Sequence, residues 1–259
     1  MKPPPNKGVE LQIHDLHRSF GHNSVLRGIS LTIPAGCVFV IMGSSGSGKS
    51  VLLRHMVGLE APDQGTILFD GVSILDAQAM AQIELAIVFQ HGGLLHSLSV
   101  GENIGLYLTE TLGLPPREVN DRVNQAIEQV GLSVTQDKHK LPADLSGGMK
   151  KRVAIARALA INPGILFYDE PTSELDPITA VTIGRQIRQL NQRHGTTSIV
   201  VTHDRDLALG IGDQIAFMTQ GTLSRPQSPA ELSQTTELAV QDFLQAGTRE
   251  DYQIDSNPS

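Results

Sequence analysis

The chain has 259 residues, a formal net charge of −7 and one cysteine, and 40% of its residues are apolar. This length accommodates one larger α/β domain or two small ones, and a single cysteine excludes an internal disulfide. The acidic balance argues against broad affinity for nucleic acid, which needs an excess of lysine and arginine, and no apolar run approaches the ~18 residues that span a bilayer.

The two ends of the chain are polar and differ from the part between them. Residues 1–8 contain three consecutive prolines and no apolar core, so we expect a short disordered lead and no signal peptide. Residues 247–259 end in Asp-Ser-Asn-Pro-Ser, and we expect a disordered tail there. Residues 9–246 are therefore predicted to form a single domain.

The domain opens with a predicted antiparallel β region. Residues 9–16 alternate apolar and polar side chains, and residues 25–33 form the next predicted strand, with a turn at residues 19–23 between them. Phe20 lies in that turn, where an aromatic ring could either stack on a nucleobase or plug the β layer. These residues alone leave the two interpretations open.

Residues 43–50 read Gly-Ser-Ser-Gly-Ser-Gly-Lys-Ser and match the phosphate-loop pattern G-x-x-x-x-G-K-[ST] at every specified position. An apolar strand is predicted just before them at residues 38–42, and a helix just after them at residues 51–57. Glycines let successive backbone N–H groups approach a triphosphate, Lys49 would reach the β- and γ-phosphates, and the Ser50 hydroxyl would ligate Mg²⁺. The residues expected to bind the nucleotide here are Gly43, Ser44, Ser45, Gly46, Ser47, Gly48, Lys49, Ser50 and Val51.

A helical insertion is predicted to follow the first half of the core. Residues 87–90 read as a short buried strand that ends in the amide Gln90, and Gly92-Gly93 then predict a mobile loop. From about residue 91 to residue 160 the apolar spacing becomes helical. Apolar residues recur every three or four positions before Gly131, which would end that helix.

A second predicted anion-binding helix start lies within this insertion. In the segment Leu145-Ser146-Gly147-Gly148-Met149, Ser146 is a good N-cap and the two glycines open the backbone at the start of a helix. Residues 150–152 are Lys-Lys-Arg. We interpret them most simply as a solvated face of this helix, with a direct role as the less favoured alternative.

Two later strands are predicted to end in groups that suit phosphate chemistry. Asp169 and Glu170 follow the apolar run 165–168, where Asp169 would hold Mg²⁺, through water, and Glu170 would polarise the attacking water. The alternative is a pair of ordinary acidic residues in a loop. Asp176 would cap the next helix with Pro177 at its first position. His203 follows the strand 198–202, where it could sense a γ-phosphate or be structural.

Together these motifs resemble the nucleotide-binding subunit of an ABC transporter. The segment 145–148 resembles the family signature, Gln90 its Q-loop, residues 173–176 its D-loop, His203 its switch histidine and Phe20 its aromatic A-loop position. The resemblance implies an α/β P-loop NTPase fold with a mainly parallel core sheet, an N-terminal antiparallel β region and an inserted helical subdomain at about residues 91–160.

The same resemblance implies roles for the motif residues. Two ATP molecules would be sandwiched in a head-to-tail homodimer. ATP held by one subunit would then contact a set of residues of the other, namely Ser146, Gly147, Gly148 and Asp176. Mg²⁺ would be held by Ser50, Gln90 and Asp169, and catalysis would depend on Glu170, His203, Lys49 and Gln90. Closure would drive an integral-membrane permease from the cytoplasmic face of the inner membrane, where this subunit would be peripheral.

A finer resemblance concerns the cargo. Residues 89–95, 99–104 and 169–179 and the methionine at Met149 look like those of the ATPases of Mla-type phospholipid and related Mce transporters. That resemblance implies phospholipid transport, with an Mce-type substrate-binding protein and a small regulatory subunit as further partners. The alternatives are an ATPase of another importer or exporter, for amino acids or lipoproteins, and a soluble ABC ATPase acting on nucleic acid or ribosomes. Glu174 departs from the small residue usual in the D-loop.

Overall fold

The computed structural model describes residues 8–235, 240–241 and 244. The expected disordered tail at residues 247–259, and all of the expected lead except Gly8, lie outside the described residues. In the described part of the chain, no helix has both the length and the apolar character that crossing a bilayer requires.

The N-terminal β region is an antiparallel sheet, as expected. Strands β1 (Leu11–Phe20), β2 (Asn23–Ile33), β4 (Gln64–Phe69) and β5 (Val72–Ser73) lie in the order β2-β1-β4-β5. The expected end of the first strand at Leu16 is wrong, because β1 continues to Phe20, which pairs with Asn23. The pairing register shifts around Asp15, whose φ is 46°. This bulge interrupts the alternation of apolar residues, so the sequence pattern does not indicate the second half of the strand.

The second sheet has the order β10-β9-β3-β8-β7-β6. It consists of β3 (Val38–Met42), β6 (Leu85–Val88), β7 (Ile165–Asp169), β8 (Thr197–Thr202), β9 (Gln214–Thr219) and β10 (Thr222–Leu223). Every pairing in it is parallel except that of β9 with β10. The expected mainly parallel core is confirmed.

One strand boundary in this sheet differs from the expectation. The strand predicted at residues 87–90 is β6 (Leu85–Val88), so Gln90 lies in a turn after the strand. The Phe89 carbonyl accepts a hydrogen bond from Gly92 N at 2.9 Å, which starts the turn, and the Phe89 side chain is 41% exposed. Phe89 is therefore apolar but does not belong to the strand.

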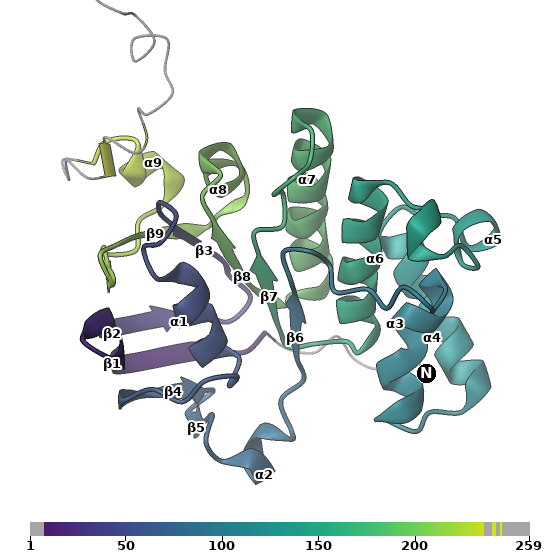
Figure 1. Cartoon of the computed structure of the whole chain (residues 1–259), viewed down its shortest axis with the longest axis horizontal. Coiled ribbons are helices and arrows are strands. Elements are labelled where there is room, and N and C mark those ends of the chain that lie inside the picture. The colour runs from purple at the N-terminus through teal and green to yellow at the C-terminus, as the bar shows by residue number, and fades with distance from the viewer. Residues whose placement is uncertain (1–7, 236–239, 242–243, 245–259) are drawn as a thin grey trace, which may run out of the picture.

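Alternate residues of the core strands face two separate apolar layers. Val38, Val40 and Met42 pack with the helices of one layer, whereas Phe39 and Ile41 pack with helix α1 (Lys49–Met56) and the antiparallel sheet. Strands covered on both faces read as continuous apolar runs, which is why the core strands could be predicted. Figure 1 shows α1 beside β1 and β2, with α7 and α6 on the other side of the parallel strands.

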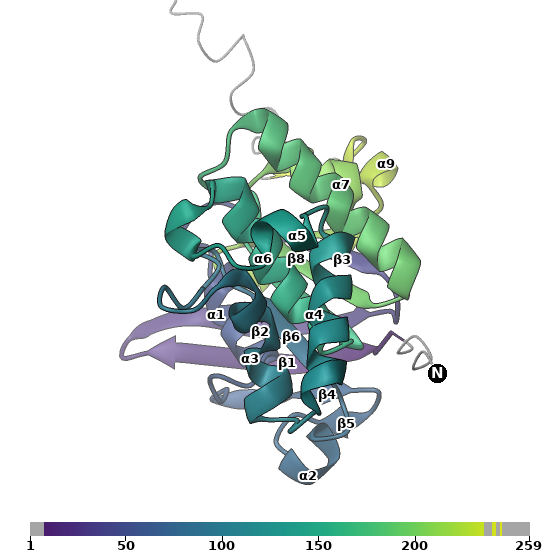
Figure 2. The same cartoon turned by 90° about the vertical axis from the view of Figure 1, so that its right-hand side faces the viewer.

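Helices also lie between β6 and β7, in the part of the chain where a helical insertion is expected. This part contains α3 (Val100–Glu110), α4 (Pro116–Gln129), α5 (Val134–Asp137), a 3₁₀ turn (Pro142–Asp144) and α6 (Gly147–Ala160). Helices α3 and α4 lie side by side at one end of the molecule (Figures 1 and 2). The described residues also form α2 (Ala77–Met80), α7 (Pro177–His194), α8 (Arg205–Ile211) and α9 (Pro229–Leu232).

Candidate active site

The loop of residues 43–48 connects β3 to α1 and requires glycine at both ends. A Cβ at Gly43 would lie 2.4 Å from the Met218 carbonyl oxygen, and a Cβ at Gly48 would lie 2.9 Å from the Met218 Cε. Gly48 also has a φ of 108°, which side-chain-bearing residues rarely adopt. The backbone of β9 therefore leaves no room for a side chain at position 43, and the positive φ favours glycine at position 48.

The N-terminus of α1 is open toward this loop. Gly48 is the N-cap and supplies no side-chain acceptor, so the first backbone N–H groups of α1 are left for an anion. Ser44, Ser45 and Gly46 are exposed, whereas Ser47 is buried and its hydroxyl has no hydrogen-bond partner. A phosphate would satisfy these donors.

Lys49 lies within the loop as a buried cation. Its Nζ donates to the carbonyl oxygens of Gly43 at 2.7 Å and Ser44 at 2.9 Å. Burial lowers the pKa of Lys49, and the nearby carboxylates of Glu170 and Asp169 partly oppose this effect. Carbonyl oxygens alone are weak partners for an ammonium group, so a bound phosphate would stabilise it further.

Asp169 ends β7 and offers an oxygen that suits a metal ion. Its Oδ1 is buried and has no hydrogen-bond partner, and burial, assisted by Glu170, raises the pKa of this carboxyl. A cation at that oxygen would supply the missing partner and would favour the ionised carboxylate. The described residues hold no group of three or more His, Cys, Asp or Glu side chains suited to a metal. Mg²⁺ typically takes one or two protein ligands together with water and phosphate oxygens.

Glu170 and His203 meet at the carboxyl ends of two neighbouring strands, β7 and β8. The Oε2 of Glu170 lies 2.9 Å from His203 Nδ1 and accepts from His203 N and Thr202 Oγ1, each at 3.3 Å. Glu170 has a φ of 47°, an unusual backbone conformation for a side-chain-bearing residue. No motif in the sequence marks Thr202, whose hydroxyl helps to hold the Glu170 carboxylate in one orientation.

The interpretation of residues 150–152 as a solvated face is wrong for its middle residue. Lys151 is only 6% exposed, and its Nζ donates to the backbone carbonyl oxygen of Gln90. The reason is that α6 is surrounded on nearly all sides. Its buried residues beyond Lys151 are Val153, Ala154, Ile155, Ala156, Ala158, Leu159 and Ala160. Small and apolar residues fill positions 153–160 except for Arg157, and this composition indicates that the helix has little solvent-exposed face.

Phe20 lies at the end of the β1–β2 hairpin and is 45% exposed. This exposure contradicts the interpretation in which the ring plugs the β layer. The Arg18 guanidinium lies 4.7 Å from the ring centroid and is held by the Asp63 carboxylate at 2.8 Å. Stacking of a nucleobase on Phe20 remains a prediction.

The signature segment is folded as a helix start. Ser146 is the N-cap of α6, and its Oγ accepts from Met149 N at 3.3 Å. A Cβ at Gly148 would lie 2.6 Å from the Thr179 Cγ2, so glycine is required next to α7. Ser146 and Gly147 are exposed.

Asp176 is the N-cap of α7, with Pro177 at the first helical position, as expected. Its Oδ1 accepts from Ile178 N and Thr179 N, and its Oδ2 accepts from Thr179 Oγ1 at 2.6 Å. These bonds, led by the one from Thr179 Oγ1, lower the pKa of the Asp176 carboxyl. Within one chain, this carboxylate is therefore occupied by its own helix.

Glu174, the unusual D-loop residue, lies in a left-handed backbone conformation with a φ of 64°. Its Oε1 lies 3.6 Å from His91 Nδ1, and both side chains are largely exposed. Exposed ion pairs contribute little to stability. The pair nevertheless shows that the loop of residues 173–176 lies beside the turn that contains Gln90 and His91.

The sheet topology brings some predicted residues together and separates others. Asp169, Glu170 and His203 lie at the carboxyl ends of β7 and β8. The loop that leads to Lys49 starts at the carboxyl end of β3, which is the next strand in the sheet. Ser146 starts α6, which lies well away from α1 in Figure 1. The signature of one chain therefore does not meet the phosphate loop of the same chain.

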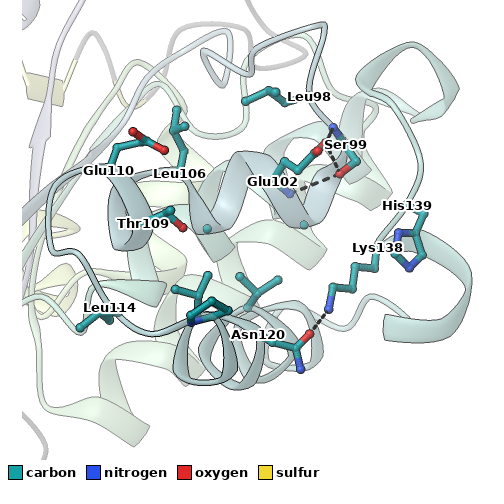
Figure 3. A pocket seen from close by; sticks show the side chains of 15 residues that line it. Leu98, Ser99, Glu102, Leu106, Thr109, Glu110, Leu114, Asn120, Lys138 and His139 are labelled. Atoms are coloured by element: carbon teal, nitrogen blue, oxygen red, sulfur yellow. Dashed lines mark hydrogen bonds between the residues drawn. The ribbon is translucent and has the colours of Figure 1, made fainter.

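A cavity of about 550 Å³ lies away from these residues, between α3 and α4. Its apolar lining includes Leu98, Leu106 and Leu114, and Lys138 and His139 lie at one end (Figure 3). Lys138 Nζ donates to Asn120 Oδ1 at 2.6 Å. This concavity belongs to the helical insertion and not to the nucleotide site.

The chain is similar to known proteins over most of its length. Residues 26–173 match the family described as ABC transporter. The chain is 36% identical to the Fe(3+) ions import ATP-binding protein FbpC 1 of Pectobacterium atrosepticum, over 86% of this chain and 62% of that protein. It is 37% identical to the methionine import ATP-binding protein MetN of Brucella abortus, over 90% of this chain and 66% of that protein.

Solved structures show the same likeness. cbiO1 from Clostridium perfringens, described as part of the ABC transporter complex cbiONQ, matches with a TM-score of 0.79 and 30% identity, over 91% of this chain and 95% of that chain. The dimeric ATP-binding cassette MJ0796 bound to ADP and Pi matches with a TM-score of 0.74 and 31% identity, over 85% and 98%. The chain spans less than two thirds of the length of the two import proteins named above.

Proposed function

The chain belongs to the ABC transporter family, and from this premise we propose that it is an ATPase subunit that energises import through a separate membrane permease. The observation that carries the proposal is the contact between Glu170 and His203, 2.9 Å apart at the ends of β7 and β8. It supplies a base and a polar sensor beside the loop of Lys49.

Each residue of the site would have a distinct role in ATP hydrolysis. The backbone N–H groups of residues 43–50 and Lys49 would bind the β- and γ-phosphates of ATP. Glu170 would accept a proton from the attacking water through one carboxylate oxygen while His203 and Thr202 hold the other. Asp169 and Ser50, with Gln90 nearby, would hold Mg²⁺, which would neutralise charge on the transferred phosphoryl group.

A homodimer would complete each site. The phosphate loop and the signature segment lie apart in one chain, and Ser146 and Gly147 are exposed. The similar cassette MJ0796 is dimeric. We infer a head-to-tail dimer in which Ser146, Gly147, Gly148 and Asp176 of one subunit contact the ATP bound by the other, and in which Phe20 stacks on the adenine.

The permease would dock on the helical insertion, from the cytoplasmic face of the inner membrane. The cavity between α3 and α4 offers an apolar concavity there, and Leu106 and Tyr107 beside it are exposed. Such an exposed apolar patch typically marks a protein interface. A peripheral position follows from this docking.

Two cargo classes remain candidates. The import proteins reported above carry Fe(3+) or methionine in their names, which favours the alternative of a nutrient importer over phospholipid transport. The phospholipid proposal rests on the Mla-like segments at residues 89–95, 99–104 and 169–179, and the proposed Mce-type and regulatory partners rest on those segments too.

The experiment that tests the ATPase proposal compares the purified chain with its Glu170→Gln variant. We expect the wild type to hydrolyse ATP, and the variant to bind ATP and dimerise without turnover. Equal turnover by the two proteins would overturn the assignment of Glu170. Reconstituting the chain with its co-purified permease, and measuring whether methionine, Fe(3+) or phospholipid stimulates ATP hydrolysis, would decide between the cargo classes.

A further inference from the structure

Lys151 is a buried cation that the proposed mechanism does not use. It is 6% exposed, and within the described residues no carboxylate lies within ion-pair distance of its Nζ. Burying an ammonium group is costly unless several acceptors surround it.

Each acceptor of Lys151 belongs to a motif of the nucleotide site. Nζ donates to the carbonyl oxygen of Gln90, to that of Glu170 at 3.3 Å, and to Ser173 Oγ at 3.5 Å. Ser173 Oγ in turn donates to the Glu170 carbonyl oxygen at 2.9 Å. One ammonium group thus joins the turn that holds Gln90, the turn that holds the proposed base and the first residue of the D-loop.

The surrounding charges favour the protonated form of Lys151. Burial lowers the pKa of this group, whereas the carboxylates of Glu174, Asp169 and Glu170 oppose that effect. The cation is therefore balanced by acidic groups that surround it without forming an ion pair with it. A neutral side chain of the same length would lose both the three hydrogen bonds and this balance.

Arg157, a second cation of α6, binds the same turn of residues 90–93 at its C-terminal end. Arg157 donates to the carbonyl oxygens of Gly93 at 2.7 Å and Gly92 at 2.8 Å. The side chain of Ala154 lies between the two cations on the helix, and a Cβ at Gly92 would contact it at 3.6 Å. The turn of residues 90–93 is thus fixed to α6 by its backbone, independently of its side chains.

We propose that Lys151 is a positioning residue that couples the signature-bearing helix α6 to the orientation of Glu170 and Gln90. The proposal rests on the proposed ATPase function. Ser146 and Gly147, at the start of α6, would touch the nucleotide held by the second subunit, so that contact would act on α6. Lys151 lies one turn further along the same helix, and its hydrogen bonds link the helix to the backbone of Gln90 and Glu170.

The test compares Lys151→Met, Lys151→Arg and the matched control Lys150→Met in the full chain. Lys150 is adjacent on α6 and only half-buried. We expect Lys151→Met to lower kcat about 10-fold while the KM for ATP stays within about 2-fold, because nucleotide-binding groups are untouched. Lys151→Arg should recover part of the loss, and Lys150→Met should behave like the wild type.

A second measurement does not depend on turnover. Hydrogen–deuterium exchange should become faster in Lys151→Met at both residues 89–93 and residues 170–174, and stay unchanged in Lys150→Met. Unchanged kcat or unchanged exchange in Lys151→Met would overturn the proposal. The proposal would also be overturned if Lys151→Met lowered nucleotide binding, melting temperature and turnover together, and if Lys151→Arg recovered none of them. A wild type without ATPase activity would instead overturn the proposed function, while the exchange data would still show whether Lys151 joins the two turns.

Discussion

The Nδ1 of His203 lies 2.9 Å from the Oε2 of Glu170, although the two residues are 33 positions apart in the sequence. Their strands, β7 and β8, are parallel neighbours, so both side chains emerge at the same edge of the sheet. The contact leaves His203 56% exposed and Glu170 only 12% exposed. A shielded carboxylate is thus paired with an imidazole that can also reach a ligand.

The first prediction concerns this pair. Replacing His203 with alanine removes the ring that holds Oε2, and we expect kcat for ATP hydrolysis to fall by roughly 10²–10⁴-fold, the range typical of acid–base groups. ATP affinity, measured with a fluorescent analogue, should change little. His139, an exposed histidine of the helical insertion, provides the control. Equal losses in His203→Ala and His139→Ala would contradict the assignment.

The second prediction tests whether the site is shared between subunits. Lys49→Ala should lower kcat/KM by roughly 10²–10³-fold, because a buried phosphate-binding cation is lost. In a covalently linked dimer with one Lys49→Ala copy and one Ser146→Arg copy, the two substitutions affect either one site or both sites. In a head-to-tail dimer they fall in the same composite site, so the other site stays intact and binds one ATP per dimer. Binding of no ATP would argue against the head-to-tail arrangement.

The third prediction concerns Phe20. If adenine stacks on this ring, Phe20→Ala should weaken ATP binding by about 1–3 kcal/mol, or roughly 5- to 150-fold in Kd. Phe20→Tyr should bind like the wild type. Inorganic triphosphate has no base and should bind both proteins alike. If Phe20→Ala weakens the two ligands equally, the ring acts on the fold of the hairpin and not on the base.

The fourth prediction concerns the permease. Leu106 is 38% exposed beside the cavity between α3 and α4, so Leu106→Glu should leave basal ATPase activity intact and reduce co-purification with the permease. Leu75→Glu is the matched control, since Leu75 is 74% exposed and lies outside this cavity. If Leu106→Glu leaves co-purification unchanged, the permease docks on a different surface.

The parts of the fold that could be predicted are those in which local pattern and tertiary context agree. Val38–Met42 is apolar throughout because both faces of β3 are covered, and its strand was predicted to the residue. The phosphate loop was predicted because glycine, lysine and serine recur at fixed positions. Ser146 and Asp176 were predicted as helix caps, and the structure places both there.

The errors share a different cause, which is that the deciding contacts are distant in sequence. The sequence predicts a turn at Phe20 because the bulge at Asp15 interrupts the strand pattern. It predicts a solvated Lys151 because lysine usually is exposed, whereas the acceptor of Lys151 at Gln90 lies 61 positions away. No local pattern reveals such a partner.

The last prediction concerns the stability of the helical insertion. Asn103 is 1% exposed, and its Nδ2 donates to the carbonyl oxygens of Leu95, Leu98 and Ser99 while its Oδ1 accepts from Leu95 N at 2.8 Å. Leucine has a similar volume but would leave these backbone groups without their partner.

We therefore expect Asn103→Leu to lower the free energy of unfolding by about 2–4 kcal/mol, since each buried polar group left unsatisfied costs about 1–3 kcal/mol. The exposed Asn120 provides the control, and Asn120→Leu should stay within about 0.5 kcal/mol of the wild type. Urea unfolding followed by circular dichroism measures both values. Equal stability of the two variants would mean that the segment of residues 95–99 finds other partners, and that Asn103 is not what fixes the entry to α3.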